Sequence, residues 1–413
     1  MIFRPDLAGA GSAPGIEVFQ LTSEPDVPGS HVYMEAQIFT PDSRRLVLHR
    51  AAYSHSGDTR DPRHRYLVCD LDQDGRLSPL TDETGATAPS VSPDGRFLYY
   101  LVDETVVNGG RLTLKRVGLD GTARETLLTL DTCLPGTRFR ASRPYPLSTL
   151  SSDGRRLAAQ VFLGDGQTSE PPFGLLVFDL PKAEARLVLQ GPTWLNMHPQ
   201  YCRSTDPDAS HDLLVQEAHN YRADARGEIL NRPDGRGIDI HVIRDDGTDF
   251  RTMPWGRDGN EFCQGHQCWR GRGTWAVTST HTRQPPEGQL IEGCTAAEAG
   301  HAGRATPGGI RNDLTRAFPH PYFYHFATDA AGRRLVTDSA PLDGGGPIYL
   351  AEFGAPGREP LRAFRCLMNP RNGPYTKGPR SVHVHPFLSP DGTLAFFNSD
   401  ESGLSQAYMI RGL

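Results

Sequence analysis

Four histidines toward the end of the chain have a spacing that suits a metal or catalytic site. His266, His325 and His385 each stand seven residues before a glycine of a recurring turn, and His383 stands two residues before His385. Residues two apart in a strand share one face. Imidazole binds Mn, Fe, Zn, Co or Ni, so the pattern does not name an ion. The alternative is that these histidines only line a channel and bond to each other and to water.

The turns belong to a phrase that recurs seven times, in which Pro-Asp-Gly or a relative precedes an apolar run. The copies follow one another at steps of about 52 to 64 residues, which suits four-stranded propeller blades. They are FTPDSRRLVLHR from Phe39, VSPDGRFLYYL from Val91, LSSDGRRLAAQV from Leu150, DPDASHDLLVQ from Asp206, WRGRGTWAVTS from Trp269, TDAAGRRLVTD from Thr328 and LSPDGTLAFFN from Leu388. Equivalent positions on successive blades are related by rotation about one axis, so the repeated histidines should surround the central channel.

These repeats predict an all-β fold: a seven-bladed β-propeller of four-stranded antiparallel blades in one domain, residues 1–413. The last unit lacks a fourth strand, and the N-terminal IEVFQLT resembles the fourth strands of other units. Pairing these two segments would close the ring and cover its edges. A long Gly-, Ala- and Pro-rich segment, about 283–319, is expected to leave the fifth unit as a loop excursion. No long amphipathic helix is expected.

Composition and simple sequence signals argue against several classes of protein. The 413 residues carry a formal net charge of −6, which argues against a basic nucleic-acid or membrane surface. No apolar run approaches the ~18 residues of a membrane span, and the opening residues lack the apolar core of a secretory signal. Seven scattered cysteines then predict reduced thiols and a cytoplasmic location. No Gly-x-Ser-x-Gly elbow supports a serine hydrolase.

At the histidines the sequence resembles the oligogalacturonate lyases, cytoplasmic seven-bladed propellers that cleave short pectic fragments. FQLTSEPDVPGSHVYMEAQIFTPDSRRLVLHR is similar to that family's opening blade, and PTWLNMHPQY to its Trp-Leu-x-His-Pro segment. GHQCW stands where the family has Thr-His-Glu-Phe-Trp, and YHFATDAAG where it has Ser-His before a repeat. SVHVHPFLSPDG is similar to the final His-x-His-Pro motif.

The resemblance implies specific roles for these residues. It makes His325, His383 and His385 ligands of a divalent ion, most simply Mn²⁺, and it makes His266 the catalytic base. The family's fourth ligand is a Gln, whose place is taken here by Arg380. Arg has no lone pair for a metal, so a substrate carboxylate is its expected partner.

The family's catalytic Arg lies before a strand that resembles IDIHVI. An extra segment, ARGEILNRPDGRG, leaves Arg236 as the first choice here and Arg222 as the second. His198 and Trp194, in the PTWLNMHPQY segment, are expected to contact substrate, although core packing is an alternative for the Trp.

The implied reaction is the β-elimination of short oligogalacturonides or related oligouronides, which gives unsaturated products. The proton at C5 is weakly acidic because it lies next to a carboxylate, and a divalent ion on that carboxylate would stabilise the charge that develops. An imidazole is a competent base near neutral pH, and an Arg supplies fixed positive charge. Two alternatives remain open: a non-catalytic propeller that binds a protein at its mouth, and a three-His enzyme that acts on another sugar acid.

Overall fold

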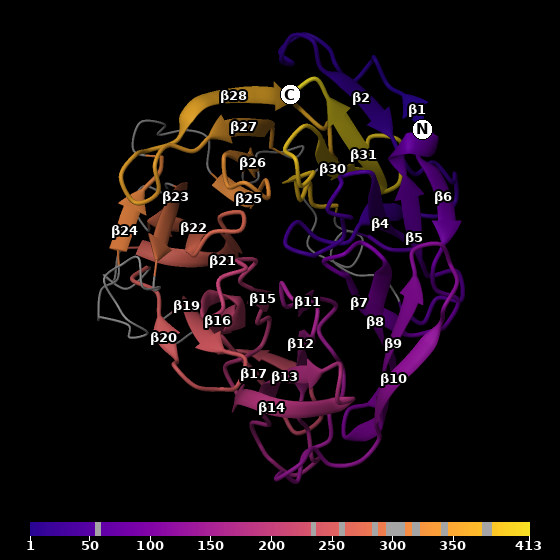
Figure 1. The fold of residues 1–413 in the computed structure, drawn as a ribbon, viewed down its shortest axis with the longest axis vertical. Coiled ribbons are helices and arrows are strands. Elements are labelled where there is room, and N and C mark those ends of the chain that lie inside the picture. Colours follow the sequence, from indigo (N-terminus) through magenta and orange to yellow (C-terminus); the bar gives the residue numbers. More distant parts are fainter. Residues whose placement is uncertain are drawn as a thin grey trace.

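The computed structural model describes residues 1–53, 59–232, 237–255, 261–282, 288–294, 310–315, 323–339, 346–373 and 382–413. These residues form seven antiparallel blades arranged in a ring around one axis (Figure 1). The prediction of an all-β seven-bladed propeller is therefore confirmed. In the described residues the only helical turns are the short η1 (Leu71–Gln73) and η2 (Ala209–His211). None of the described helices has the length and apolar character needed to cross a membrane.

The strands of the blades are given from the innermost outward. The first blade is β3 (Gly29–His31), β4 (Arg45–Arg50), β5 (Arg65–Asp70) and β6 (Arg76–Pro79). The second is β7 (Ala86–Val91), β8 (Phe97–Val106), β9 (Gly109–Gly118) and β10 (Glu125–Leu130). The third is β11 (Ser148–Leu150), β12 (Arg156–Phe162), β13 (Phe173–Asp179) and β14 (Glu184–Gly191). The fourth is β15 (Gln200–Tyr201), β16 (Asp212–Ala218), β19 (Ile238–Arg244) and β20 (Arg251–Thr252).

The remaining blades follow the same order. The fifth is β21 (Glu261–Trp269), β22 (Trp275–Thr282), β23 (Gly288–Cys294) and β24 (Ile310–Asp313). The sixth is β25 (Phe323–Thr328), β26 (Arg334–Ser339), β27 (Ile348–Glu352) and β28 (Arg362–Met368). The seventh is β29 (Phe387–Leu388), β30 (Ala395–Ser399), β31 (Gln406–Arg411), β2 (Glu17–Gln20) and β1 (Ile2–Phe3).

The recurring phrase forms the turn between the first and second strands of a blade. In the second blade Ser92 Oγ donates to Asp94 Oδ1 and accepts from the main-chain N–H of Phe97 at 2.9 Å. The glycine that follows, Gly95, has φ of 71°. A left-handed residue of this kind is accommodated most easily by Gly, which explains why the turn repeats in the sequence.

The ring closes as the repeats predict. Strand β2 pairs antiparallel with β31, with Val18 opposite Ile410, so the N-terminal strand becomes the fourth strand of the seventh blade. Strand β1 adds a fifth, which the repeats did not predict. Arg4 also contacts Glu401 of the seventh blade, with Nη1 and Oε1 2.6 Å apart. Both ends of the chain therefore lie on one blade (Figure 1).

Two segments differ from what the repeats predict. The range 283–319, expected to be one loop excursion, contains β23 and β24, which are the outer strands of the fifth blade. The rest of that range, 283–287, 295–309 and 316–319, lies outside the described residues. In the fourth blade, a two-stranded hairpin of β17 (Tyr221–Ala223) and β18 (Ile229–Asn231) is inserted between β16 and β19.

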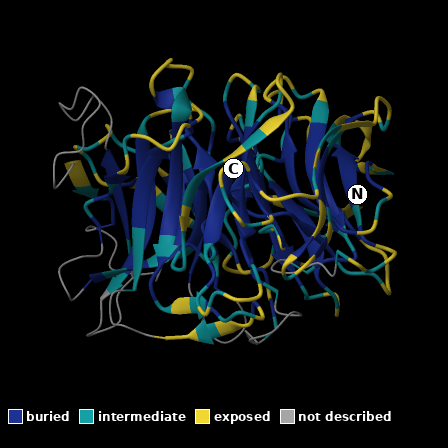
Figure 2. Ribbon diagram, turned by 90° about the horizontal axis from the view of Figure 1, so that it is seen from below, coloured by how far each residue is buried: buried dark blue, intermediate teal, exposed yellow. Residues whose placement is uncertain are grey.

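Apolar side chains fill the spaces between neighbouring blades, and exposed residues concentrate in the loops at the two faces (Figure 2). Between the third and fourth blades, for example, Phe162 and Phe173 pack with Tyr201 and Leu213. Each blade is therefore held on both sides, and the inner strands have a fixed height along the channel. The seven cysteines are free thiols, and five of them are buried.

Candidate metal centre

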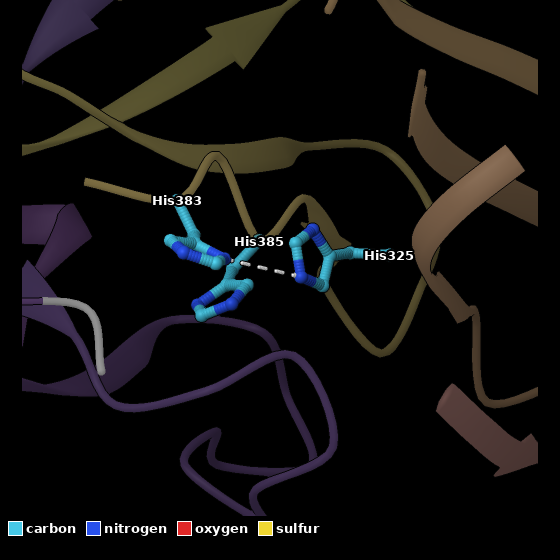
Figure 3. Close-up of side chains that lie close together, drawn as sticks. All are labelled: His325, His383 and His385. Atoms are coloured by element: carbon cyan, nitrogen blue, oxygen red, sulfur yellow. Dashed lines mark hydrogen bonds between the residues drawn. The ribbon is translucent and has the colours of Figure 1, made fainter. Parts of the chain in front are cut away.

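Three of the predicted histidines meet in one buried group, named here the three-His cluster. It consists of His325 in β25 and of His383 and His385 in the segment before β29. A ring nitrogen from each lies within 4.8 Å of the others, and all three residues are buried. His383 Nδ1 and His325 Nε2 are 3.4 Å apart (Figure 3). The sixth and seventh blades thus present three imidazoles to one point.

A buried carboxyl group orients one of these rings. Asp338 in β26 lies 2.8 Å from His325 Nδ1 through Oδ2, and its Oδ1 accepts the main-chain N–H of His325 at 2.7 Å. Burial raises the pKa of Asp338 well above its usual range, and the main-chain donors oppose this rise only in part. With the proton on Nδ1, His325 presents the lone pair of Nε2 to the cluster. This is the arrangement in which metal-binding histidines are usually held.

Sequence analysis did not identify Asp338, although the repeats carry a signal for it. It stands six residues after the repeat glycine, where other units have Gln160 and Asn398. Both amides also accept a main-chain N–H: Gln160 Oε1 from Met197 at 2.7 Å, and Asn398 Oδ1 from His31 at 3.0 Å. A polar side chain at this position therefore fixes a neighbouring segment, and in the sixth blade it also reaches a histidine ring.

The inner strands are irregular where the histidines stand. The ladders of β21 with β22 and of β25 with β26 shift register between Cys263 and Gln267 and between Phe323 and Phe326. His385 has φ of 42°. Bulges and left-handed residues re-aim side chains and are frequent beside functional sites. The matched repeat positions thus share a local distortion as well as a residue type.

His266, predicted to be the base, lies beside the three-His cluster. Its ring centroid is 4.5 Å from that of His325 and 4.7 Å from that of Tyr324. The preceding Gly265 has φ of +91°, and a Cβ there would lie 2.8 Å from Ile238 Cδ1. The Gly-His pair therefore allows the strand to turn this imidazole toward the sixth blade. His266 is 8% exposed.

His198 belongs to a second buried network next to the cluster. Its Nδ1 lies 3.0 Å from Glu35 Oε2, and its Nε2 lies 2.9 Å from the hydroxyl of Tyr145. The ring of Tyr33 lies 5.3 Å from that of His198 and 4.6 Å from that of His385. Burial raises the pKa of Glu35, although His198 opposes this effect. His198 is thus linked to the three-His cluster through Tyr33, a residue that sequence analysis missed.

The other predicted site residues are placed differently. Trp194 packs against His241 and Phe250 of the fourth blade, at centroid distances of 5.5 and 6.0 Å. Arg222 lies in β17, where Nη1 donates to the main-chain carbonyls of His219 and Tyr221 at 2.9 and 2.7 Å. The predictions for Arg236 and Arg380 fall outside the described residues.

A cavity of about 320 Å³ lies at the turn end of the inner strands. The repeat turns line it, with Phe39, Trp269 and Phe387 as its aromatic wall. Among the described residues its charged side chains are Arg203, Arg272 and Asp329, and none of its described lining residues is a histidine. This cavity is therefore distinct from the three-His cluster.

The donor set of the three-His cluster fits a divalent transition metal. Neutral imidazole nitrogens are ligands for Mn, Fe, Co, Ni and Zn. Three of them in one buried group, one ring fixed by a carboxyl group, would leave further coordination positions for oxygen atoms. A purely structural site would instead be closed by four protein ligands. The geometry therefore suits an ion that can also bind a ligand.

Comparison with known proteins relates the fold of this chain to that of solved structures. No protein-family model matches the sequence, and no curated protein sequence matches it. A structure described as oligogalacturonate lyase in complex with manganese aligns over 97% of this chain and 94% of its own, with a TM-score of 0.67 and 20% identity. An oligogalacturonate lyase from Vibrio parahaemolyticus aligns over 97% and 95%, with a TM-score of 0.69 and 17% identity.

A prolyl endopeptidase aligns more weakly. Its TM-score is 0.52 at 12% identity, and only 50% of its chain is covered. The two lyase structures, in contrast, align over nearly their whole length. The chain described here has the seven-bladed propeller fold of the oligogalacturonate lyases.

Proposed function

We propose that this protein is a lyase that cleaves short oligogalacturonides, or related oligouronides, by metal-assisted β-elimination. The observation that carries the proposal is the three-His cluster with a fourth imidazole, His266, against it. The fold shared with two oligogalacturonate lyases, one of them in complex with manganese, supports the same substrate class and ion. We further propose that the seven blades form one domain and that the protein acts in the cytoplasm, where its free thiols would stay reduced.

The cluster residues would hold Mn²⁺ or a similar divalent ion. When bound, such an ion supplies Lewis acidity toward the uronate carboxylate and so acidifies the proton at C5. In the proposed reaction His266 takes that proton, the C5–H electrons form the C4=C5 double bond, and the C4–O4 bond breaks with its electrons going to O4. The proton lost from C5 balances the one that O4 gains from His266 or from water. His266 thus acts as base and can act as acid in one cycle.

The position of His266 suits this role. It comes from the fifth blade, whereas the cluster comes from the sixth and seventh, so the imidazole lies to one side of the three ligands. Thr278 Oγ1 donates to the main-chain carbonyl of His266 at 3.0 Å, and Thr337 Oγ1 donates to that of His325 at 2.9 Å. Equivalent threonines therefore hold the base and a ligand at one height. This limits the movement of one ring relative to the other.

Arginines are proposed to bind the negative groups of the substrate. Arg236, or Arg222 as the second choice, would stabilise charge on the departing O4, and Arg380 would bind a second uronate carboxylate. A guanidinium suits both tasks because it can donate two parallel hydrogen bonds to a carboxylate. His198 and Trp194 complete the proposed substrate-binding set, with His198 linked to the cluster through Tyr33.

The test combines metal analysis with the ultraviolet absorbance of unsaturated uronate, measured on oligomers of galacturonate and of other uronic acids. We expect Mn²⁺-dependent product from galacturonate oligomers. His266→Ala should retain the metal and bind the substrate, yet lose roughly 10²–10⁴-fold in kcat. His211→Asn is the matched control, because His211 is a half-exposed histidine paired with Asp245 at 3.0 Å.

Two results would contradict the proposal. If no oligouronide gives unsaturated product with any divalent ion, the reaction is not a β-elimination, and the chain is a binding propeller or an enzyme on another sugar acid. If His266→Ala no longer binds the metal, rather than binding it with a lowered kcat, His266 is a ligand and the base is another residue.

A further inference from the structure

A second group of metal-binding side chains lies on the fourth blade, and we name it the blade-four cluster. Its members are two histidines and two carboxylates, Glu217, His219, Asp239 and His241. Ligand atoms of Glu217, Asp239 and His241 lie within 4.8 Å of one another. His219 Nε2 is 2.9 Å from Asp239 Oδ2 and 3.7 Å from Glu217 Oε2. Three potential ligand atoms therefore lie in one group, and the imidazole of His219 lies next to two of them.

The blade-four cluster lies at the root of the inserted hairpin. Glu217 is the last residue but one of β16, and Asp239 lies opposite it in the ladder with β19. His219 follows β16 directly, and the chain then leaves the sheet as β17 and β18 before it returns at β19. Two members thus precede the insertion and two follow it.

The ligand atoms are oriented by neighbours that do not belong to the cluster. His241 Nδ1 lies 3.0 Å from Thr252 Oγ1, which directs Nε2 toward Glu217 Oε2 at 3.4 Å. Thr193 Oγ1 donates to Glu217 Oε1, which leaves Oε2 for the cluster. Trp194 and Phe250 pack on the ring of His241 and form an apolar wall. Outer hydrogen bonds and an apolar shell of this kind are typical of metal sites.

The distances between ligand atoms in the blade-four cluster can be compared with those expected around a bound ion and with those of direct hydrogen bonds. Ligands ~2.0–2.2 Å from a tetrahedral ion lie ~3.3–3.6 Å from one another. The separation of Glu217 Oε2 from His241 Nε2, 3.4 Å, has this size, and its separation from His219 Nε2, 3.7 Å, is slightly larger; both are long for direct hydrogen bonds. His219 Nε2 and Asp239 Oδ2, 2.9 Å apart, form a direct hydrogen bond that would have to lengthen when an ion binds. Within the described residues His241 Nε2 makes no hydrogen bond of normal length: Glu217 Oε2 is 3.4 Å away, and His241 is only 3% exposed. A buried nitrogen without a hydrogen bond is costly unless something binds it.

We propose that the blade-four cluster binds a second divalent ion, of the zinc type, which clamps the root of the β17–β18 insertion. Two nitrogen and two oxygen ligands make a closed tetrahedral set, which is the usual form of structural zinc. Two carboxylates balance the charge of the ion.

This ion differs in role from the one proposed for the three-His cluster. It would join the end of β16 to the start of β19 and so fix where the insertion leaves and rejoins the blade. Arg222 lies in the insertion, three residues after His219, and donates to the carbonyl of His219 at 2.9 Å. The blade-four cluster therefore acts on Arg222 as a positioning group, through the backbone.

The experiment measures zinc bound per chain by the purified full-length protein after removal of metals and dialysis against Zn²⁺. It uses His383→Ala as the background, which removes a ligand of the three-His cluster. We expect this variant to retain one tightly bound zinc and to melt at a higher temperature with zinc than without. Adding His241→Asn should remove that zinc and abolish the thermal shift. His211→Asn in the same background should preserve both, because its pair with Asp245 lies outside the cluster.

The outcomes are distinct. If the His383→Ala protein binds no zinc and shows no thermal shift, the blade-four cluster is a set of ion pairs and the proposal is wrong. If the protein with both His383→Ala and His241→Asn does not fold, Glu217→Gln takes the place of His241→Asn. As a second measurement, Co²⁺ bound to the His383→Ala protein should give the intense visible absorption of a tetrahedral site. A weak octahedral spectrum would also overturn the proposal. Zinc content, the thermal shift and the Co²⁺ spectrum do not depend on lyase activity. They therefore test the blade-four cluster even if the proposed lyase reaction is wrong.

Discussion

The three-His cluster and the blade-four cluster use different parts of the propeller. The first gathers its side chains at the inner ends of the sixth and seventh blades, and the second from the middle strands of a single blade. The three-His cluster contains only imidazoles, whereas the blade-four cluster contains two carboxylates as well. Three ligands leave room for a substrate, and four do not. In the two proposals, one fold would hold a reactive and a structural ion, and the choice of strands that supply the ligands would distinguish them.

The way each cluster is supported also differs. In the three-His cluster, Asp338 contacts both the ring and the main chain of His325. In the blade-four cluster, the supporting groups are the hydroxyls of Thr193 and Thr252. A carboxyl group next to an imidazole increases the basicity of that ligand more than a hydroxyl group does. We therefore expect the two clusters to respond differently to substitution and to pH.

The largest expected effect is on activity. His383→Ala removes one of three ligands and should lower the rate of elimination by on the order of 10³-fold or more, because the Lewis acid supplies several kcal/mol. The rate is measured as unsaturated product under saturating Mn²⁺, with His211→Asn as the control. A rate near that of the unaltered protein would show that the three-His cluster is not the reactive site. The proposed difference in role between the two clusters would then be wrong.

A smaller effect is expected from Asp338→Asn. The main-chain N–H of His325 requires an oxygen at Oδ1, so the new amide nitrogen would face Nδ1. The ring proton would then move to Nε2 and point into the cluster. We expect the affinity for Mn²⁺ to fall roughly 10–100-fold, as measured by competition with a chelator of known affinity. Thr337→Val, which removes the bond to the carbonyl of His325, should change this affinity much less.

The affinity for the metal ion should fall more steeply with decreasing pH at the three-His cluster than at the blade-four cluster. In general, protons compete with a metal ion for an imidazole nitrogen in mildly acidic solution, whereas a carboxylate stays ionised down to about pH 4. The logarithm of the affinity should therefore fall by about three per pH unit at the three-His cluster and by about two at the blade-four cluster. Titrations of the His383→Ala and His241→Asn proteins between pH 6 and 5 measure each slope alone. Equal slopes would mean that the two clusters do not differ in ligand type.

The smallest effect concerns the stability of the metal-free protein. Burial acts to raise the pKa of Glu217, but the contacts with His241, Thr193 and His219 lower it to about 2 in the folded chain, below the ~4.3 of an unfolded chain. The contribution of the ionised Glu217 carboxylate to the free energy of unfolding is therefore complete above pH ~4.3 and is lost as the pH falls toward 2. Glu217→Gln should cost about 1 kcal/mol of unfolding free energy at pH 5, and this difference should shrink by pH 3. Urea unfolding at both pH values tests this expectation, which a constant or growing difference would contradict.

Much of the site was predictable because the propeller is periodic. A glycine at each turn sets the register of its hairpin, and the pairing of β25 with β26 or of β29 with β30 follows locally from it. Since equivalent positions occupy equal heights, matched histidines in the sequence become neighbours in the channel. His266 and the three-His cluster were identified in this way. Asp338 lay within the same periodicity, at a position that carries a polar side chain in several units.

The remaining contacts do not follow from the period. Glu35 and His198 come from the first and fourth units and meet at 3.0 Å, a contact that depends on the tilt of the blades and on the paths of two loops. The blade-four cluster depends on a hairpin inserted within one blade, and the repeat contains no information about it. Trp194, expected to contact substrate, packs on His241.

The sequence by itself therefore determined the number of blades, the closure of the ring by the N-terminal strand and the set of histidines that share one height. These features repeat, and local turn chemistry together with alternating burial is enough to specify them. Only the tertiary structure decided which carboxyl group orients His325, which residues join His198 to the cluster, and that Glu217 and His241 face one another. Those contacts join segments whose separation depends on how neighbouring blades pack and where an insertion rejoins the sheet.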